Sequence, residues 1–147
     1  MALKIRLRAE EHLVINGALV KATEPTTLLL MNHAKFMHDK QIMRPEQANT
    51  AAKRIYFAVQ NAYLATPEER PAMLTILRQL VADFRDATLS QNMQQKLEEL
   101  EGCVGQDNYY KALQIAREVI AYEDLVLGVG TFYQDSKDET DSVTEEP

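Results

Sequence analysis

The sequence predicts an α+β fold: a small antiparallel N-terminal sheet followed by a helical C-terminal part of about four helices. Two periodicities predict it. Charged and aliphatic residues alternate near the amino terminus, and from Pro45 onward apolar residues recur with the spacing of an α-helix. We expect a β-sheet part over residues 1–44, a helical part over 45–130, and an acidic, disordered tail over 131–147. The length of 147 residues suits one domain, or two very small ones, with a modest core.

The first predicted strand is "LKIRLR", residues 3–8. Aliphatic and cationic residues alternate along it, and in a strand successive side chains point to opposite faces. One face therefore carries Leu3, Ile5 and Leu7, and the other carries Lys4, Arg6 and Arg8. We expect the aliphatic face to be buried and the cationic face to be exposed.

The segment "HLVINGALVK", residues 12–21, predicts a β-hairpin, because Asn16-Gly17 suits a type I′ turn. The turn fixes the register, which pairs His12 with Lys21, Leu13 with Val20, Val14 with Leu19, and Ile15 with Ala18. Both faces of this hairpin are partly apolar, so a second layer must cover one of them. We expect the hairpin to join strand 3–8 in one sheet, and residues 26–43 to supply one or two more short strands.

The first predicted helix begins at Pro45 and includes "ANTAAKRIYFAVQNAYL", residues 48–64. Its main apolar stripe gathers within an arc of roughly 120°, and consists of Ala48, Ala51, Ala52, Ile55, Val59, Ala62 and Tyr63. The opposite side carries Lys53, Phe57, Gln60 and Leu64. A helix with apolar residues on two sides is expected to lie between two layers, of which the second is either internal or a partner chain.

Three more helices follow. A capping box of Thr66 and Glu69 starts one that reaches about Asp86, and another runs from Ser90 to Glu101 and stops at Gly102. The last begins after Asp107 and ends at Gly128. Glu123 projects from the apolar stripe of this helix. Because an unpaired buried charge is very costly, we expect a Tyr, Arg or Lys side chain to bond it.

Charge is distributed unevenly along the chain. Residues 1–44 hold seven Lys and Arg against four Asp and Glu, a formal charge of +3, whereas the whole chain carries −6. Residues 134–147 contain six acids and one lysine and have few large aliphatic residues, a composition typical of disorder.

Several classes of function find no support in the sequence. It contains no phosphate loop, no dinucleotide fingerprint and no nucleophile elbow, so we expect neither an enzyme nor a cofactor. In a strand-like context His33 and His38 fall on opposite faces, which argues against a metal site, and Cys103 suits a small core residue. No apolar run approaches the ~20 residues of a membrane span, and the amino terminus lacks the apolar stretch of a signal peptide, so we expect a cytoplasmic protein.

Four segments together resemble the FlbT family of bacterial flagellin-synthesis regulators, across about residues 2–127. They are the "LK" strand opening, "VINGA", "ANTAAKRIYFAVQNAYL" and "DNYYKALQIAREVIAYEDLV". The resemblance implies post-transcriptional control through the 5′ leader of flagellin messenger RNA, opposed or assisted by a small helical partner called FlaF. It implies no catalytic residue. Lys53, Arg54, Tyr56 and Tyr109–Lys111 match characteristic segments of the family, which leaves open whether they contact RNA, a partner or the core.

Two hypotheses from different classes follow. In the first, the protein binds the flagellin leader RNA through phosphate contacts made by Lys4, Arg6, Arg8 and Lys21. In the second, it is an adaptor or chaperone for FlaF or flagellin, with only an indirect effect on RNA, as its acidic helical part favours. The predicted partner surface consists of Val14, Leu19, Lys53, Phe57 and Leu64, and a second copy of the chain could also cover it.

Overall fold

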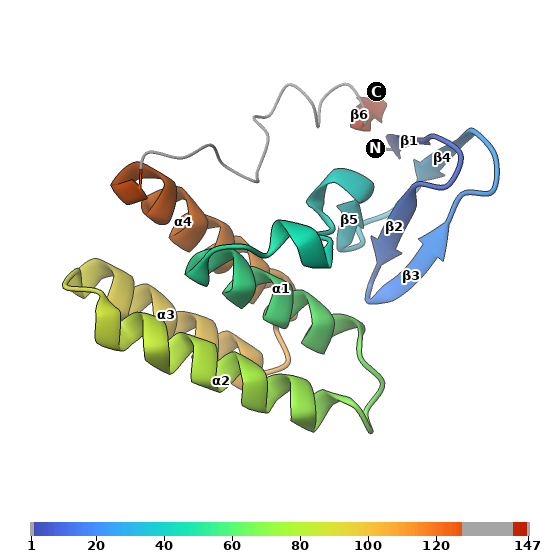
Figure 1. The fold of residues 1–147 in the computed structure, drawn as a ribbon. Coiled ribbons are helices and arrows are strands. Elements are labelled where there is room, and N and C mark those ends of the chain that lie inside the picture. The colour runs from blue at the N-terminus through green and yellow to red at the C-terminus, as the bar shows by residue number, and fades with distance from the viewer. Residues whose placement is uncertain (1, 128–142, 147) are drawn as a thin grey trace. The chain divides into compact units, whose positions relative to one another are not determined.

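A computed structural model describes residues 2–127 and 143–146 of the chain (Figure 1). The described residues divide into two compact units. We call them the sheet unit, residues 2–42 and 143–146, and the helical unit, residues 43–127. Strands come first and four α-helices follow, which confirms the predicted α+β class.

The sheet unit contains two three-stranded antiparallel sheets. In one, β1 (Ala2–Leu7) lies between β4 (Thr26–Leu30) and β6 (Val143–Glu146). In the other, β2 (His12–Ile15) lies between β3 (Ala18–Lys21) and β5 (Phe36–His38). The expected pairing of the first strand with the hairpin is therefore wrong, because β4 and β6 occupy both edges of β1 and β5 occupies the free edge of β2.

The hairpin itself forms as predicted. Its register pairs His12 with Lys21, Leu13 with Val20, Val14 with Leu19, and Ile15 with Ala18. Both turn residues have positive φ, 49° at Asn16 and 87° at Gly17, as a type I′ turn requires. The Asn16 backbone N–H donates to the Lys35 carbonyl at 2.8 Å, and the Asn16 side chain accepts from the Lys35 N–H at 3.0 Å. Asn16 therefore also fixes the chain that leads into β5.

A small core connects the two sheets. Ile5 and Leu7 from β1, Leu13 from β2 and Ala22 after β3 are buried against one another, with Phe36 packed beside them. The predicted alternation of β1 is confirmed at Ile5 and Leu7, which are 1% and 5% exposed, and Leu3 is half-buried. One face of β1 thus belongs to the core.

The helical unit consists of α1 (Ala51–Leu64), α2 (Arg70–Ala87), α3 (Gln91–Gly105) and α4 (Tyr109–Leu127). Helix α1 packs against α2 and α4, and α3 packs against α4 (Figure 1). The core side chains with 2% exposure or less come from all four helices and the segment before α1: Met43, Ala52, Ile55, Tyr56, Val59, Ala62, Leu77, Val81, Leu97, Leu100, Ala112, Leu113, Ala116, Val119 and Ile120.

The first helix begins later than the sequence predicted. Pro45 opens a short 3₁₀ turn, η2 (Pro45–Gln47), and α1 starts only at Ala51. Thr50 is extended, and its Oγ1 accepts from the Lys53 N–H at 3.3 Å, so Thr50 is the cap that defines the start. A second layer does cover the other side of α1 at Gln60, whose amide bonds both the N–H and the carbonyl of Met43, at 2.7 and 2.9 Å.

The caps of the later helices are confirmed in part. The Thr66–Glu69 capping box forms, with reciprocal bonds of 3.2 and 3.3 Å, and the hydrogen bonds from Thr66 lower the pKa of the Glu69 carboxyl. Residues 67–69 form a turn, however, and α2 begins only at Arg70, later than predicted. Ser90 caps α3, but α3 continues past Gly102 to Gly105. Asp107 is not the cap of α4: it has a φ of 59°, and Asn108 Oδ1 accepts the Lys111 N–H at 3.3 Å.

Four residues of the tail that was expected to be disordered form a strand. Val143–Glu146 form β6, with Lys4 opposite Thr144 and Ala2 opposite Glu146 in the register, so for these four residues the structure differs from the expectation of disorder. Residues 128–142 and 147 lie outside the described residues.

Candidate basic face and apolar pocket

The outer face of the β4–β1–β6 sheet is basic. Lys4 and Arg6 alternate with the buried Ile5 and Leu7, so strand geometry places both cations on the face opposite the core. Arg6 is exposed as predicted, whereas Lys4 is half-buried, contrary to the expectation of an exposed side chain. On β4 their cross-strand neighbours are Leu29 and Thr27, and Leu29 is 51% exposed. The face therefore offers cations beside small or aliphatic neighbours on β4, without the aromatic side chains on which bases stack.

The other two predicted cations lie elsewhere in the sheet unit. Arg8 is exposed just after β1, and its backbone N–H donates to Glu11 Oε1 at 2.7 Å. Lys21 belongs to β3 in the second sheet, where its Nζ lies 2.9 Å from Glu10 Oε2 in an exposed ion pair. The structure thus groups Lys4 and Arg6 on one face of one sheet, with Arg8 continuing from the same strand, and assigns Lys21 to the other sheet.

His38 holds the backbone beneath the basic face. Its Nδ1 accepts the Lys40 N–H at 3.4 Å, so Nε2 carries the hydrogen that the Arg6 carbonyl accepts at 3.1 Å. The ring is 3% exposed, and both nitrogens are engaged. His38 therefore holds the Arg6 backbone through a hydrogen bond between the two sheets. No sequence pattern indicated this role, because the two residues are 32 positions apart.

The residues of the predicted partner surface differ in how far they are exposed. Val14 is fully buried, whereas its cross-strand neighbour Leu19 is 53% exposed. Val14 accordingly offers no surface to a partner, because its face of the hairpin is already covered at that position. On α1, Lys53, Phe57 and Leu64 are half-buried.

The aromatic side chains in the segments that carry the family resemblance lie mostly in the core of the helical unit. Tyr56 is fully buried, with the Arg117 guanidinium 5.8 Å from its ring centre. Tyr109 is 5% exposed, stacks on Tyr63 at 5.9 Å, and lies under Arg70. Burial raises the pKa of the Tyr109 hydroxyl. These aromatics belong to the core of the helical unit, and the matching cations Arg54 and Lys111 are exposed.

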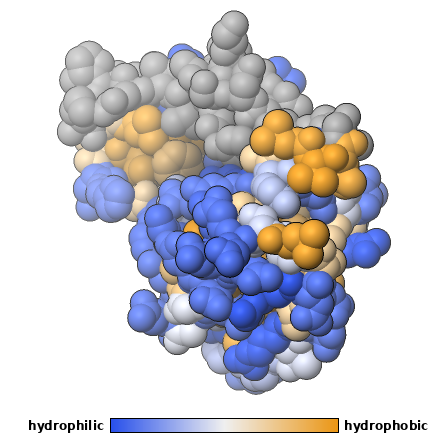
Figure 2. All heavy atoms as spheres, turned by 90° about the vertical axis from the view of Figure 1, so that its left-hand side faces the viewer, coloured by the Kyte–Doolittle hydropathy of each residue, from blue (hydrophilic) through white to orange (hydrophobic). Residues whose placement is uncertain are grey.

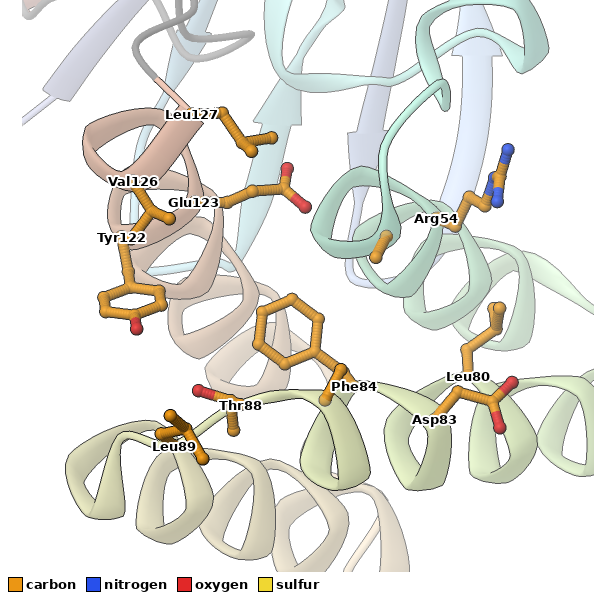
Figure 3. Close-up of a pocket in the computed structure, with 12 residues that line it drawn as sticks. Arg54, Leu80, Asp83, Phe84, Thr88, Leu89, Tyr122, Glu123, Val126 and Leu127 are labelled. Atoms are coloured by element: carbon orange, nitrogen blue, oxygen red, sulfur yellow. The ribbon is translucent and has the colours of Figure 1, made fainter.

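A pocket of about 490 Å³ opens at one end of the helical unit, where the start of α1, the end of α2 and the end of α4 meet (Figure 3). Its lining is mainly apolar and comprises Leu80, Phe84, Leu89, Tyr122, Val126 and Leu127. The charged lining residues are Arg54, Asp83 and Glu123. The sequence did not predict this pocket. The feature that pointed to it was Glu123, a carboxylate within the apolar stripe of its helix.

Glu123 extends from α4 toward the start of α1 (Figure 3). It is 7% exposed, and its Oε2 accepts the backbone N–H of Ala52 at 3.0 Å. The expected side-chain partner is thus wrong: the donor is a backbone amide in the first turn of α1, where unpaired N–H groups and the helix dipole both favour a carboxylate. The second oxygen, Oε1, is buried and has no hydrogen-bond partner.

The remaining sequence candidates are placed as follows. His33 is exposed and His38 is buried, and among the described residues no three His, Cys, Asp or Glu side chains gather so as to hold a metal ion. Cys103 is a free thiol that is half-buried rather than part of the deep core. None of the described helices combines the length and apolarity needed to cross a membrane.

The fold and these two surfaces define a small α+β protein with a basic sheet face and an apolar pocket among its helices. The family model "Flagellar protein FlbT" matches residues 3–127. The chain is 32% identical over 130 residues to the "Probable flagellum biosynthesis repressor protein FlbT" of Mesorhizobium japonicum, covering 86% of this chain and 85% of that one. It is 33% identical over 138 residues to the "Flagellum biosynthesis repressor protein FlbT" of Caulobacter vibrioides, covering 87% and 91%.

The chain therefore belongs to the FlbT family, as the four sequence segments indicated. No solved structure matches it significantly.

Proposed function

We propose that this protein represses flagellin synthesis after transcription, by binding the 5′ leader of flagellin messenger RNA through the basic face of its sheet unit. The family relationship supports the regulatory role, because the relatives are named flagellum biosynthesis repressors. The observation that carries the RNA contact is the alternation on β1, which turns Lys4 and Arg6 away from the core. Such a role requires binding and no catalysis, and it belongs in the cytoplasm, where messenger RNA is translated.

The charge of the two units supports this choice of surface. Residues 2–42 contain six Lys and Arg against four Asp and Glu, a formal charge of +2, and the two glutamates of β6 bring the sheet unit to zero. Residues 43–127 contain nine Lys and Arg against twelve Asp and Glu, or −3. Phosphate groups are therefore repelled by the helical unit and not by the sheet unit, where the cations of β1 can attract them. Since aliphatic and small residues flank the cations on β4, contacts to the sugar-phosphate backbone account for the binding better than base stacking does.

Replacing Arg6 and Arg8 by alanine tests the basic face. Each lost phosphate contact should lower the affinity for a short flagellin-leader RNA and flatten the salt dependence by about 0.7 log unit for a single strand. The matched control replaces Arg78 and Lys111, two exposed cations of the helical unit, by alanine, which changes the net charge equally. Affinities are measured by electrophoretic shift and fluorescence anisotropy at several salt concentrations around ~150 mM.

The outcome separates the hypotheses. The basic face is the RNA site if the arginine pair alone weakens binding and flattens the salt slope. If the two double variants lower RNA affinity equally, only net charge matters. If neither lowers it, the RNA site lies elsewhere. Should the parent protein bind no leader RNA unless a helical partner such as FlaF is present, the protein is an adaptor.

The adaptor function is the second candidate, and exposed apolar residues favour it. On the sheet unit Leu19 is half-exposed, and on α1 Phe57 and Leu64 are half-buried. Changing Phe57 and Leu64 to serine should weaken a protein partnership, with FlaF or with a second copy, while leaving RNA affinity intact if the surfaces are separate. Sedimentation and RNA binding, measured on the same preparation, decide this.

A further inference from the structure

We propose that the pocket of the helical unit binds an amphipathic helix of a partner protein, with an Arg or Lys of that helix donating to Glu123 Oε1. This deepens the proposed partnership, because it names a site and a recognition chemistry outside the residues that the sequence assigned to a partner. It does not depend on RNA contact, so the two can fail separately.

The unpaired oxygen of Glu123 is the first reason. Glu123 is 93% buried, since its exposure is 7%, and only Oε2 is bonded, to the Ala52 N–H. Oε1 is buried without a donor and belongs to a residue that lines the pocket. Buried carboxylate oxygens are normally hydrogen-bonded, and leaving one unpaired is costly. A ligand that brings a donor into this pocket would complete the site.

The apolar rim is the second reason, and it indicates the size of the ligand. Leu89 is 99% exposed, Val126 64% and Leu127 57%, and all three line the pocket from the α2–α3 turn and the end of α4. The face in Figure 2 shows apolar atoms gathered in patches on a largely hydrophilic surface. A small molecule held beside Glu123 would leave much of this rim in water. A helix that presents apolar residues at positions i, i+3 or i+4, and i+7 would cover both the pocket and the rim.

Charge selects a cationic donor. Glu123 and Asp83 line the pocket with one cation, Arg54, whose side chain points away from Glu123 (Figure 3). An Arg or Lys on the partner helix would meet complementary charge here, whereas a carboxylate would be repelled.

Two designed peptides test the proposal on the full chain. Each is an amphipathic helix of about 18 residues, or five turns, with leucines on one face. One carries a single Arg at the centre of that face, and the other carries Met in its place. By fluorescence anisotropy, the Arg peptide should bind about tenfold tighter, the ratio expected for one charge-assisted hydrogen bond. Glu123→Gln should abolish this preference, and Glu99→Gln, an exposed site on α3 outside the pocket, should preserve it.

The rim is tested separately from the carboxylate. The double variant Leu89→Ser with Val126→Ser should lower the affinity for both peptides at least several-fold, because the two substitutions remove apolar surface that a bound peptide would cover. Ile76→Ser, a 53% exposed site on α2 outside the pocket lining, should leave both affinities unchanged. All these variants change surface or rim positions except Glu123→Gln, whose folding is checked by its unfolding midpoint.

Any of five results would overturn the proposal. Four concern the ligand: equal affinity for the two peptides, a preference that survives Glu123→Gln, no binding of either peptide, or pocket occupation by a small amine such as phenethylamine alone. The fifth is self-association. A parent chain that is dimeric, and that dissociates when Leu89 and Val126 become serine, would show that a second copy covers the pocket instead. RNA affinity measured alongside should not change in the pocket variants, and the Arg6 and Arg8 variant should still bind the Arg peptide.

Discussion

The sheet unit and the helical unit bury their apolar residues to very different extents. All four residues of β3 are exposed, and so are the three central residues of β4. In α4, by contrast, eight residues are buried, which include the aliphatic positions Leu113, Val119 and Ile120. The helical unit is a well-filled core with a pocket at one end, whereas the sheet unit is a thin layer whose outer faces meet solvent.

The difference teaches how the two surfaces arise. A helix that packs on several neighbours buries most of its apolar positions, so its binding surface is confined to helix ends that the packing leaves open. A short two-layer β structure leaves one face of each sheet outside the core, and there the alternation of residues decides the chemistry. On β1 this alternation supplies cations.

The largest difference in stability is expected between the same substitution made in the two units. Leu97, fully buried in α3, and Leu29, 51% exposed on β4, are the same residue type in the two settings. Leu97→Ala should lower the free energy of unfolding by about 2–5 kcal/mol, because it removes buried methyl groups and leaves a cavity. Leu29→Ala should change it by no more than about 0.5 kcal/mol. Chemical denaturation followed by circular dichroism measures both, and a large cost for Leu29→Ala would mean that a further layer covers the outer sheet face.

An intermediate effect should arise at the pocket. Glu123→Ala leaves the Ala52 N–H without its acceptor, so the free energy of unfolding should fall by about 1–3 kcal/mol. Glu123→Gln keeps an acceptor oxygen and loses only the charge at the amino terminus of α1, so the cost should be about 0.3–1 kcal/mol. Equal costs for the two variants would show that the charge, and not the hydrogen bond, carries the stabilisation.

The smallest effects should have opposite signs in the two units. Gly17 has a φ of 87°, so Gly17→Ala should destabilise the hairpin by about 1–2 kcal/mol. Gly102 lies within α3, and a Cβ added there meets no atom within 4 Å. Gly102→Ala should therefore stabilise the helical unit by about 0.5–1 kcal/mol. Thermal unfolding of the two variants measures both, and a stabilising Gly17→Ala would contradict the type I′ turn.

The sequence by itself determined the features that depend on neighbouring residues. The Asn16-Gly17 turn fixes the hairpin register because two positive φ angles leave one way for the flanking residues to pair. The alternation on β1 fixes which residues share a face, and the Thr66–Glu69 and Ser90 caps bond amides three residues away. The same local reasoning was wrong where two adjacent candidates competed, because Asn108, and not Asp107, caps α4.

The tertiary structure decided everything that depends on distant residues. The partners of β1 come from β4 and β6, and no local pattern distinguishes these edges from the hairpin as a place to pair. The sequence did not show whether Val14 would be covered by this chain or by a partner, and the folded chain itself buries it. Glu123 finds its donor in an amide 71 residues earlier, and it lines a pocket that exists only once three helix ends meet. Hydrogen bonds and cavities of this kind require elements far apart in the chain to be packed, and periodicity cannot specify that packing.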